Sequence, residues 1–307
     1  MSADHKAQRS TLKLGLDATE SIIRAVVVND VGQVVARSAQ NVAAGGVAQA
    51  LREALRRARS DAAADIVAAG VATPWPGEPP SPEISSAAGD ALGMTPVAVA
   101  SGTAAVVAET WCGATRGFKD VIAVSIGEHV TAGLIVGGEV WKGAHGYAGS
   151  VGWLALNPVE REDYRRLGGL EAEVAAAGIV RRLVWRIKSG DHSQLLDQVG
   201  GDLARITADL VFQGARTGDG VCISVVRDTA KYVGMAVSNL VSVLDPDAIV
   251  LGGTLATSGD LMLDAIRLEC SRRLSPPQAD RIKIVLSTLG SDAVAIGAAR
   301  LAALAAP

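Results

Sequence analysis

The chain has 307 residues, of which 49% are hydrophobic, 20% are charged and 3% are aromatic, and its formal net charge is −3. Its mild acidity and its lack of a basic stripe argue against a nucleic-acid partner. Its three cysteines, Cys112, Cys222 and Cys270, are too widely spaced for a disulfide framework or a metal knuckle. No stretch approaches the ~18 apolar residues of a membrane span. Residues 1–13 are polar and lack the apolar region of a signal peptide, so a cytoplasmic location without a membrane partner is expected.

The first part of the chain predicts an antiparallel meander followed by alternating helices and strands. Short turns separate runs of β-branched residues, and one stretch with apolar residues at helical spacing predicts an amphipathic helix. Five prolines between Thr73 and Pro82 predict a loop. The predicted elements are strands at Leu12–Leu16, Ile22–Asn29 and Val34–Ser38, a helix at Val47–Ala58, strands at Ile66–Ala72 and Val97–Ala100, and a helix at Thr103–Thr110.

A second copy of this pattern predicts a second α/β domain. It opens with another strand–turn–strand meander, continues through a long helical region, and ends with two strands that alternate with helices. The sequence therefore predicts two similar domains facing one another across a central cleft. The predicted elements are strands at Val121–Ile126, Thr131–Val136 and Glu139–Trp141, helices between Leu170 and Leu244, strands at Ala248–Leu251 and Lys283–Ser287, and helices at Ser258–Arg273 and Ala293–Ala305.

Two predicted turns lie where a two-domain sugar kinase would bind phosphate. The first is predicted over Gly15–Ser21 and the second over Gly127–His129, each between two apolar strands. Phosphate binding needs free backbone N–H groups and close approach, which favour glycine. Glu20 and Glu128 instead place a carboxylate in each turn, so the pattern suggests a kinase scaffold with impaired nucleotide binding. Gly252 and Gly253, before a predicted helix, are the remaining candidate for the nucleotide end of the site.

The chain resembles the ROK family (repressors, open reading frames, kinases) of the actin-like ATPase superfamily. The resemblance implies two ribonuclease-H-like domains, over residues 12–118 plus 290–307 and over residues 119–289. It also implies a homodimer, for which the apolar-rich predicted helix Ala172–Val184 gives additional support. The matching segments are Gly15–Asp17, Gly70–Pro74, Gly143–Gly152, Leu244–Gly253 and Leu289–Ala299.

The departures from the family pattern concern its chemistry. Where active members carry Asn-Asp-x-Asn, whose aspartate is the general base, this chain reads Ala100–Thr103 and places Ser101 at the position of the base. A serine hydroxyl cannot act as a base near neutral pH without help. The sugar-binding Gly-Glu-x-Gly-His reads Gly149–Trp153, and the cysteines of the family's zinc site are absent from Tyr164–Glu171. No zinc, other metal or cofactor is therefore expected.

The residues that the resemblance would place at a ligand also have simpler interpretations. Asp17 could cap a turn, and His145 could be a solvated loop residue. Glu20 and Glu128 could be ordinary surface residues of turns, and Gly252 and Gly253 could serve only the backbone geometry. The ligand-binding candidates are Asp17, Ser101, Thr103, His145, Ser150, Trp153 and Glu171, and the former nucleotide positions are Glu20, Gly127, Glu128, Gly252 and Gly253.

Three classes of function fit these patterns. The favoured one is a non-catalytic ROK-like protein, a pseudokinase, that binds a small, sugar-like ligand or a partner through its cleft. The alternative is a divergent ATP- and Mg²⁺-dependent sugar or cyclitol kinase, for which Glu171 is the only candidate base. The third is a repurposed enzyme or a ROK-type regulator. Because the first strand begins at Leu12, no winged helix of its own, and hence no direct DNA binding, is expected.

Overall fold

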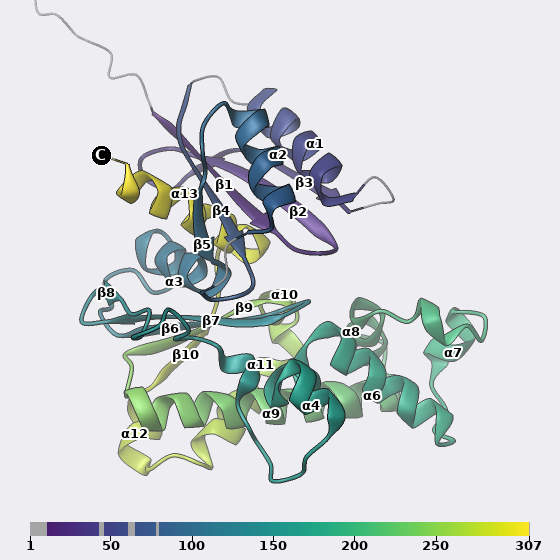
Figure 1. Ribbon diagram of the computed structural model, residues 1–307. Helices are drawn as coiled ribbons and strands as arrows, with labels where there is room; N and C mark the ends of the chain where they lie inside the picture. The colour runs from purple at the N-terminus through teal and green to yellow at the C-terminus, as the bar shows by residue number, and fades with distance from the viewer. Residues whose placement is uncertain (1–10, 43–45, 61–64, 78–79, 307) are drawn as a thin grey trace, which may run out of the picture. The chain divides into compact units, whose positions relative to one another are not determined.

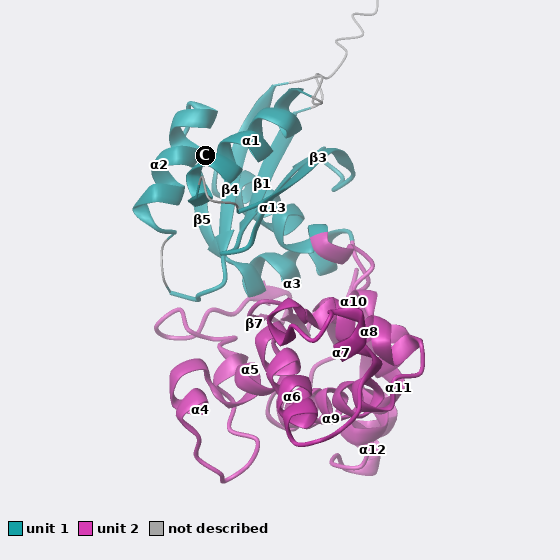
Figure 2. Cartoon of the chain, turned by 90° about the vertical axis from the view of Figure 1, so that its right-hand side faces the viewer, with its two compact units in different colours: residues 1–112, 292–307 teal, residues 113–291 magenta. Residues whose placement is uncertain are grey.

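The computed structural model describes residues 11–42, 46–60, 65–77 and 80–306. The chain divides into two compact units (Figure 2). Unit 1 contains the residues up to Cys112 and those from Asp292 onward, and unit 2 contains Gly113–Ser291. Among the described residues, no helix combines the length and the hydropathy that a membrane crossing requires.

Unit 1 is built on a five-stranded mixed sheet in the order β3-β2-β1-β4-β5 (Figure 1). The antiparallel part is the predicted meander, and β4 and β5 add to β1 in parallel. The strands are β1 (Leu12–Ala18), β2 (Ile22–Val28), β3 (Val34–Asn41), β4 (Ile66–Thr73) and β5 (Val97–Ala100). The helices are α1 (Gly46–Ser60), α2 (Pro82–Leu92), α3 (Ser101–Trp111) and α13 (Ala293–Ala305).

The alternation of β1 assigns each face of this sheet to different helices. Leu14 and Leu16 point to one face and are buried in the core that includes Leu51 and Leu55 of α1. Gly15 points to the other face, where a Cβ atom would lie 1.7 Å from the carbonyl oxygen of Ala295 in α13. Gly15 therefore lies within a strand and allows close packing of a helix, and the prediction that it opens a phosphate turn is wrong.

Unit 2 repeats the strand order of unit 1, with the sheet β10-β9-β6-β7-β8 (Figure 1). Strands β6, β7 and β8 form the antiparallel meander, and β9 and β10 add to β6 in parallel. This shared topology confirms the predicted fold class of two α/β domains of the actin-like type. The strands are β6 (Val121–Ile126), β7 (Val130–Val136), β8 (Glu139–Val140), β9 (Ala248–Gly253) and β10 (Lys283–Leu286).

The helices of unit 2 surround α9, a helix of 25 residues (Gly220–Leu244) with a largely buried face. Helices α5, α6, α8 and α11 all contact α9. The others are η1 (Val151–Trp153), α4 (Glu162–Leu167), α5 (Gly169–Val174), α6 (Ala176–Lys188), α7 (Gln194–Gln198), η2 (Leu203–Arg205), α8 (Ala208–Arg216), α10 (Thr254–Thr257), α11 (Gly259–Ser271), α12 (Pro276–Arg281) and η3 (Gly290–Asp292), which begins in unit 2.

Several predicted boundaries differ from the structure, and two of the differences concern segments at the candidate site. The helix expected over Ala172–Val184 is divided at Ala175 (φ −65°, ψ 162°), which ends α5 and precedes α6. At the break, the backbone N–H of Ala176 donates a hydrogen bond to the distant carbonyl of Gly127 at 2.9 Å. The strand predicted to end at Leu251 continues through Gly253 as β9.

Candidate ligand site

The carboxyl ends of β1, β4 and β5 bring three of the polar positions of unit 1 to one edge of its sheet. Asp17 lies opposite Ala72, and the next residue, Thr73, lies opposite Ala100, which precedes Ser101. Asp17 is buried, with an oxygen 3.7 Å from the guanidinium of Arg24. Ligands of open α/β sheets bind at this kind of edge.

Two hydroxyl groups at this edge have no hydrogen-bond partner among the described residues. Ser101 is the first residue of α3, and its Oγ atom is buried without a hydrogen-bond partner among the described residues. The Oγ1 atom of Thr73 is also buried without a hydrogen-bond partner among the described residues. Thr103 lies half-buried in the first turn of α3. Since a serine becomes a nucleophile or a base only beside a group that takes its proton, the Ser101 hydroxyl is not activated in this structure.

The turn between β1 and β2 closes on its own backbone. The N–H of Thr19 donates to the carbonyl of Ile22 at 3.1 Å, and the N–H of Ile22 donates to Thr19 Oγ1 at 3.2 Å. Glu20 stands exposed at the tip of this turn. Phosphate recognition depends on free N–H donors, so two donors that a phosphate could use are already occupied here.

The turn between β6 and β7 is also closed and lies beside the end of β9. The N–H of Gly127 donates to the carbonyl of His129 at 3.0 Å. Strand pairing sets Ser125 opposite Gly252 and Ile126 opposite Gly253, so the structure brings these two predicted nucleotide positions beside the turn. Gly253 has φ +66°, and a Cβ there would lie 2.2 Å from the carbonyl oxygen of Ile126. Close packing therefore accounts for this glycine without a ligand.

Glu171 is the best-defined polar group among the predicted ligand contacts. It lies on α5, is 5% exposed, and accepts a hydrogen bond from the backbone N–H of Val130 at 3.0 Å. Its other oxygen lies 3.2 Å from Nδ1 of His129. An ionised carboxylate only accepts hydrogen bonds, so this contact requires the proton on Nδ1. The two oxygens together have about four acceptor sites, which leaves capacity for ligand hydroxyls.

The glycine-rich segment Gly143–Gly152, which ends within η1, approaches Glu171 at Gly152. A Cβ at Gly152 would lie 3.1 Å from Oε2 of Glu171, so η1 and α5 are in direct contact. Ser150, just before η1, is half-buried, and its hydroxyl donates to the carbonyl of Tyr147 at 2.8 Å. Trp153 is 54% exposed, and His145 is exposed in the preceding loop. The exposed indole of Trp153, which follows the glycine nearest to Glu171, is suited to stacking on the apolar face of a sugar ring.

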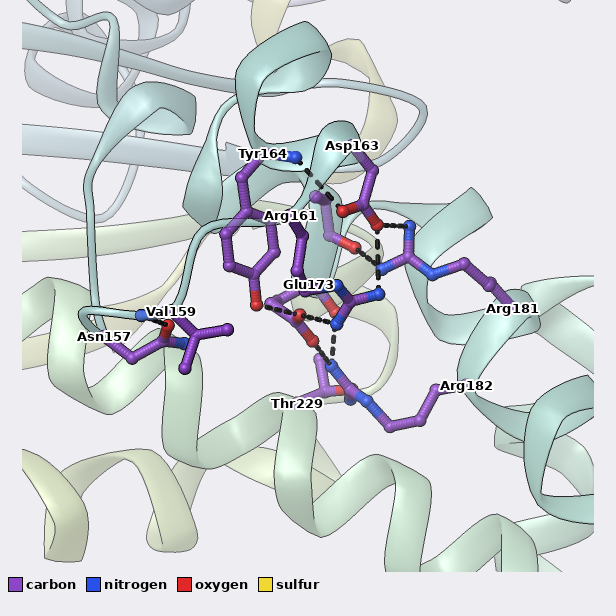
Figure 3. A network of polar contacts seen from close by, with 10 residues as sticks. Asn157, Val159, Arg161, Asp163, Tyr164, Glu173, Arg181, Arg182 and Thr229 are labelled. Atoms are coloured by element: carbon purple, nitrogen blue, oxygen red, sulfur yellow. Dashed lines mark hydrogen bonds and ion pairs between the residues drawn. The ribbon is translucent and has the colours of Figure 1, made fainter. Parts of the chain in front are cut away.

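A second carboxylate on α5, Glu173, forms the centre of a polar network (Figure 3). It is 4% exposed and accepts hydrogen bonds from Arg182, from Tyr164 and, at 3.2 Å, from Arg161. Burial, together with the hydrogen bond to Glu173, raises the pKa of Tyr164 above its ordinary value of 10.0. The phenol therefore remains a donor well above neutral pH.

Sequence reasoning missed His129 and Glu173. His129 belongs to the predicted second phosphate turn, and its contact with Glu171 joins residues 42 positions apart. Glu173 follows Glu171 by two positions in an otherwise apolar stretch. Buried acidic residues need hydrogen-bond partners, so this second acid was a signal for a buried network, although its partners could not be read from the sequence.

Comparison with known proteins decides the family. The ROK family model matches residues 90–304. The chain belongs to the ROK family. A glucokinase from Halalkalibacterium halodurans is 33% identical over 196 residues, 63% of this chain and 59% of that protein. A xylose repressor from Caldicellulosiruptor bescii is 28% identical over 200 residues, 63% of this chain and 48% of the repressor.

Solved structures agree on the fold over nearly the whole ROK chain. A ROK family glucokinase from Streptomyces griseus, in complex with glucose and AMPPNP, superimposes with a TM-score of 0.82 at 23% identity and covers 95% of this chain and 99% of the glucokinase. At this level of identity the likeness concerns the fold. The sequence matches span about half to three fifths of the two curated relatives, which are a kinase and a regulator.

Proposed function

We propose that this ROK protein is a pseudokinase that binds a small, sugar-like ligand and does not phosphorylate it. The observation that carries the proposal is the buried Ser101, which the family resemblance places where active members have their catalytic base. Its buried hydroxyl has no hydrogen-bond partner among the described residues. Phosphoryl transfer to a sugar hydroxyl needs a residue that accepts the hydroxyl proton. Serine without an adjacent base does not supply one.

The closed turns support the proposal from the nucleotide side. The N–H groups of Thr19 and Gly127 are engaged within their own turns. Glu20 and Glu128 add negative charge at the positions that the family resemblance assigns to phosphate. We expect ATP-Mg²⁺ to bind with a Kd above about 1 mM, which corresponds to about 4 kcal/mol of binding free energy.

The ligand contacts in the proposal come mainly from unit 2. Glu171 would accept hydrogen bonds from ligand hydroxyls, and Trp153 would stack on an apolar ring face. Ser150 stands where the family pattern has a sugar-binding glutamate, and it offers a single hydroxyl. Asp17, Thr103 and His145 remain proposed contacts, whose contributions are expected to be smaller because none of them pairs a buried carboxylate with an adjacent aromatic side chain.

Calorimetric titration tests this proposal directly. Hexoses, amino sugars and cyclitols are titrated into the protein with and without ATP-Mg²⁺. At least one sugar is expected to bind without nucleotide, and Glu171→Gln should weaken it about tenfold or more, as expected for loss of a hydrogen bond to a charged group. Arg216→Ala is the matched control, because it removes a polar contact with Asp260 elsewhere in unit 2. Submillimolar ATP affinity, or a sugar affinity unaffected by Glu171→Gln, contradicts the proposal.

A divergent sugar kinase is the second candidate function. The 33% identity to a glucokinase favours it. Glu171 would then have to serve as the base, although its two oxygens already face Val130 and His129. ATP and Mg²⁺ would be the cofactors, and ADP release that depends on both a sugar and Glu171 would identify this activity.

The proposal includes a homodimer in the cytoplasm, with no direct nucleic-acid partner and no zinc. The large exposed Trp185 on α6 offers an apolar group that a second copy could cover. One chain has a mass of 31.3 kDa, and light scattering at micromolar concentration should report twice that mass. A monomer under those conditions removes the dimer from the proposal and leaves ligand binding unaffected.

A further inference from the structure

Helix α5 carries two buried carboxylates on opposite faces. Glu171 and Glu173 are two positions apart, which corresponds to a rotation of about 200° around an α-helix. Glu171 faces the start of β7 through Val130 and His129. Glu173 faces the arginines and the tyrosine of the network (Figure 3). Any rotation of this six-residue helix would move both carboxylates together.

The donors to Glu173 come from both sides of α5 along the chain. Arg182, on α6, donates to the side chain and, at 2.9 Å, to the backbone carbonyl of Glu173. The same guanidinium donates to Oγ1 of Thr229 on α9 at 3.0 Å and stacks over the ring of Tyr232, 5.4 Å from its centroid. Arg182 therefore connects Glu173 to the longest helix of unit 2.

The segment before α5 is held to the same network by polar contacts. No residue of α4 is buried. Tyr164 of α4 donates to Glu173, and Asp163 forms ion pairs with Arg161 and with Arg181 of α6. Since apolar burial contributes little to the attachment of α4, these contacts determine where the segment lies.

Stability alone does not explain a buried ion cluster of this kind. Replacing buried ion pairs by well-packed apolar residues is often neutral or stabilising, so stabilisation is a weak explanation for them, and in some proteins such groups specify one arrangement instead. We propose that Glu173, with Arg182 and Tyr164, positions Glu171 by fixing the rotation of α5. This inference rests on the proposed function, in which Glu171 contacts the ligand. Glu173 is thus a positioning residue that touches no ligand.

The imidazole of His129 reports the position of Glu171 in the ligand-free protein. Its Nδ1 lies 3.2 Å from Glu171, and the partner of one ring nitrogen determines which nitrogen carries the proton. The chain has four histidines, so the imidazole ¹⁵N signals can be assigned by substitution. The variants are Glu173→Gln and Tyr164→Phe, with Glu171→Ala as the reference for a lost contact and Arg216→Ala as the control.

In ligand-free protein, both network variants should shift the His129 Nδ1 signal toward that of Glu171→Ala, and the control should leave it unchanged. Sugar affinity should fall about tenfold in Glu173→Gln, within the range that outer-shell partners contribute at metal sites. If Glu173→Gln does not fold, Tyr164→Phe, which removes one hydroxyl, decides the result. An unchanged His129 signal in a folded Tyr164→Phe or Glu173→Gln protein overturns the inference. Absence of sugar binding to the unmodified protein instead contradicts the proposed function. The His129 signal would still test whether Glu173 positions Glu171.

Discussion

The polar groups at the strand edge of unit 1 and those on α5 of unit 2 are satisfied to very different degrees. In unit 1, the hydroxyls of Thr73 and Ser101 are buried without hydrogen-bond partners among the described residues. In unit 2, Glu171 and Glu173 are equally buried, but every carboxylate oxygen faces a donor. The difference shows that the buried polar groups of one unit can be fully hydrogen-bonded while buried hydroxyls of the other are not.

The largest expected effect concerns the backbone packing that holds unit 1 together. A Cβ at Gly297 of α13 would lie 1.7 Å from the carbonyl oxygen of Ala104 in α3. Because neither helix backbone can yield locally, Gly297→Ala should lower the free energy of unfolding by about 3 kcal/mol. Denaturant titration measures this. Gly220→Ala, at a site with no atom within 4 Å of the added carbon, is the control and should be neutral or slightly stabilising. Equal stabilities of the two variants would refute the packing argument.

Removal of the Glu173 carboxylate tests whether unit 2 depends on its ion network. Glu173→Ala leaves Arg182, whose side chain is 15% exposed, without its carboxylate partner. We expect the free energy of unfolding to fall by about 2 kcal/mol. This is below the full value for buried pairs, because Arg161, which also donates to Glu173, is partly solvated. Asp260→Ala, which breaks an exposed pair with Arg216, should cost at most about 0.5 kcal/mol in the same denaturant titration. A Glu173 variant as stable as the Asp260 variant would show that the buried network contributes no more to stability than an exposed ion pair does.

The acid dependence of unit 2 should include a contribution from Asp219, which caps α9. Burial alone would raise its pKa, but hydrogen bonds from Cys222, Ser193 and Gln194 outweigh burial and hold the pKa below the ordinary 3.8. A lowered folded-state pKa gives stability that is present above the unfolded value and is lost as the pH falls through the folded value. Asp219→Asn should therefore cost about 1 kcal/mol at neutral pH. The stability curves of the two proteins should converge below about pH 4, and a constant difference at all pH values would contradict this assignment.

The smallest expected effects concern the unpartnered hydroxyls of unit 1. Since the side chains of Ser101 and Thr73 make no hydrogen bond to any described residue, Ser101→Ala and Thr73→Val should be neutral or stabilising by up to about 1 kcal/mol. Ser193→Ala is the matched control, because that hydroxyl donates to Asp219 at 2.8 Å, and it should be destabilising by about 1 kcal/mol. Thermal unfolding shows whether each substitution raises or lowers the stability of the protein. Destabilisation by Ser101→Ala would show that its hydroxyl has a partner in solution.

The strands and the antiparallel meander of each unit followed closely from the sequence, because apolar alternation and short turns determine local pairing. The parallel pairing of β4 with β1 and of β9 with β6 joins distant segments and was not predicted. The break between α5 and α6 did not, since alanine favours helix and the residue that ends α5 is Ala175. Its cause is a tertiary hydrogen bond from Ala176 to Gly127. Glu171 was identified through a family motif, whereas Glu173 and His129 depend on contacts between distant segments. The role of Gly15 was misjudged because close helix packing and phosphate approach both require glycine.

Phosphotransfer is the most direct test of the central claim. The unmodified protein is incubated with ATP-Mg²⁺ and each of a panel of hexoses, amino sugars and cyclitols, and ADP release is measured. The account predicts no turnover above the sugar-free background, because Ser101 supplies no base and Glu171 is engaged by Val130 and His129. Sugar-dependent turnover that disappears in Glu171→Gln would contradict it and establish a divergent sugar kinase.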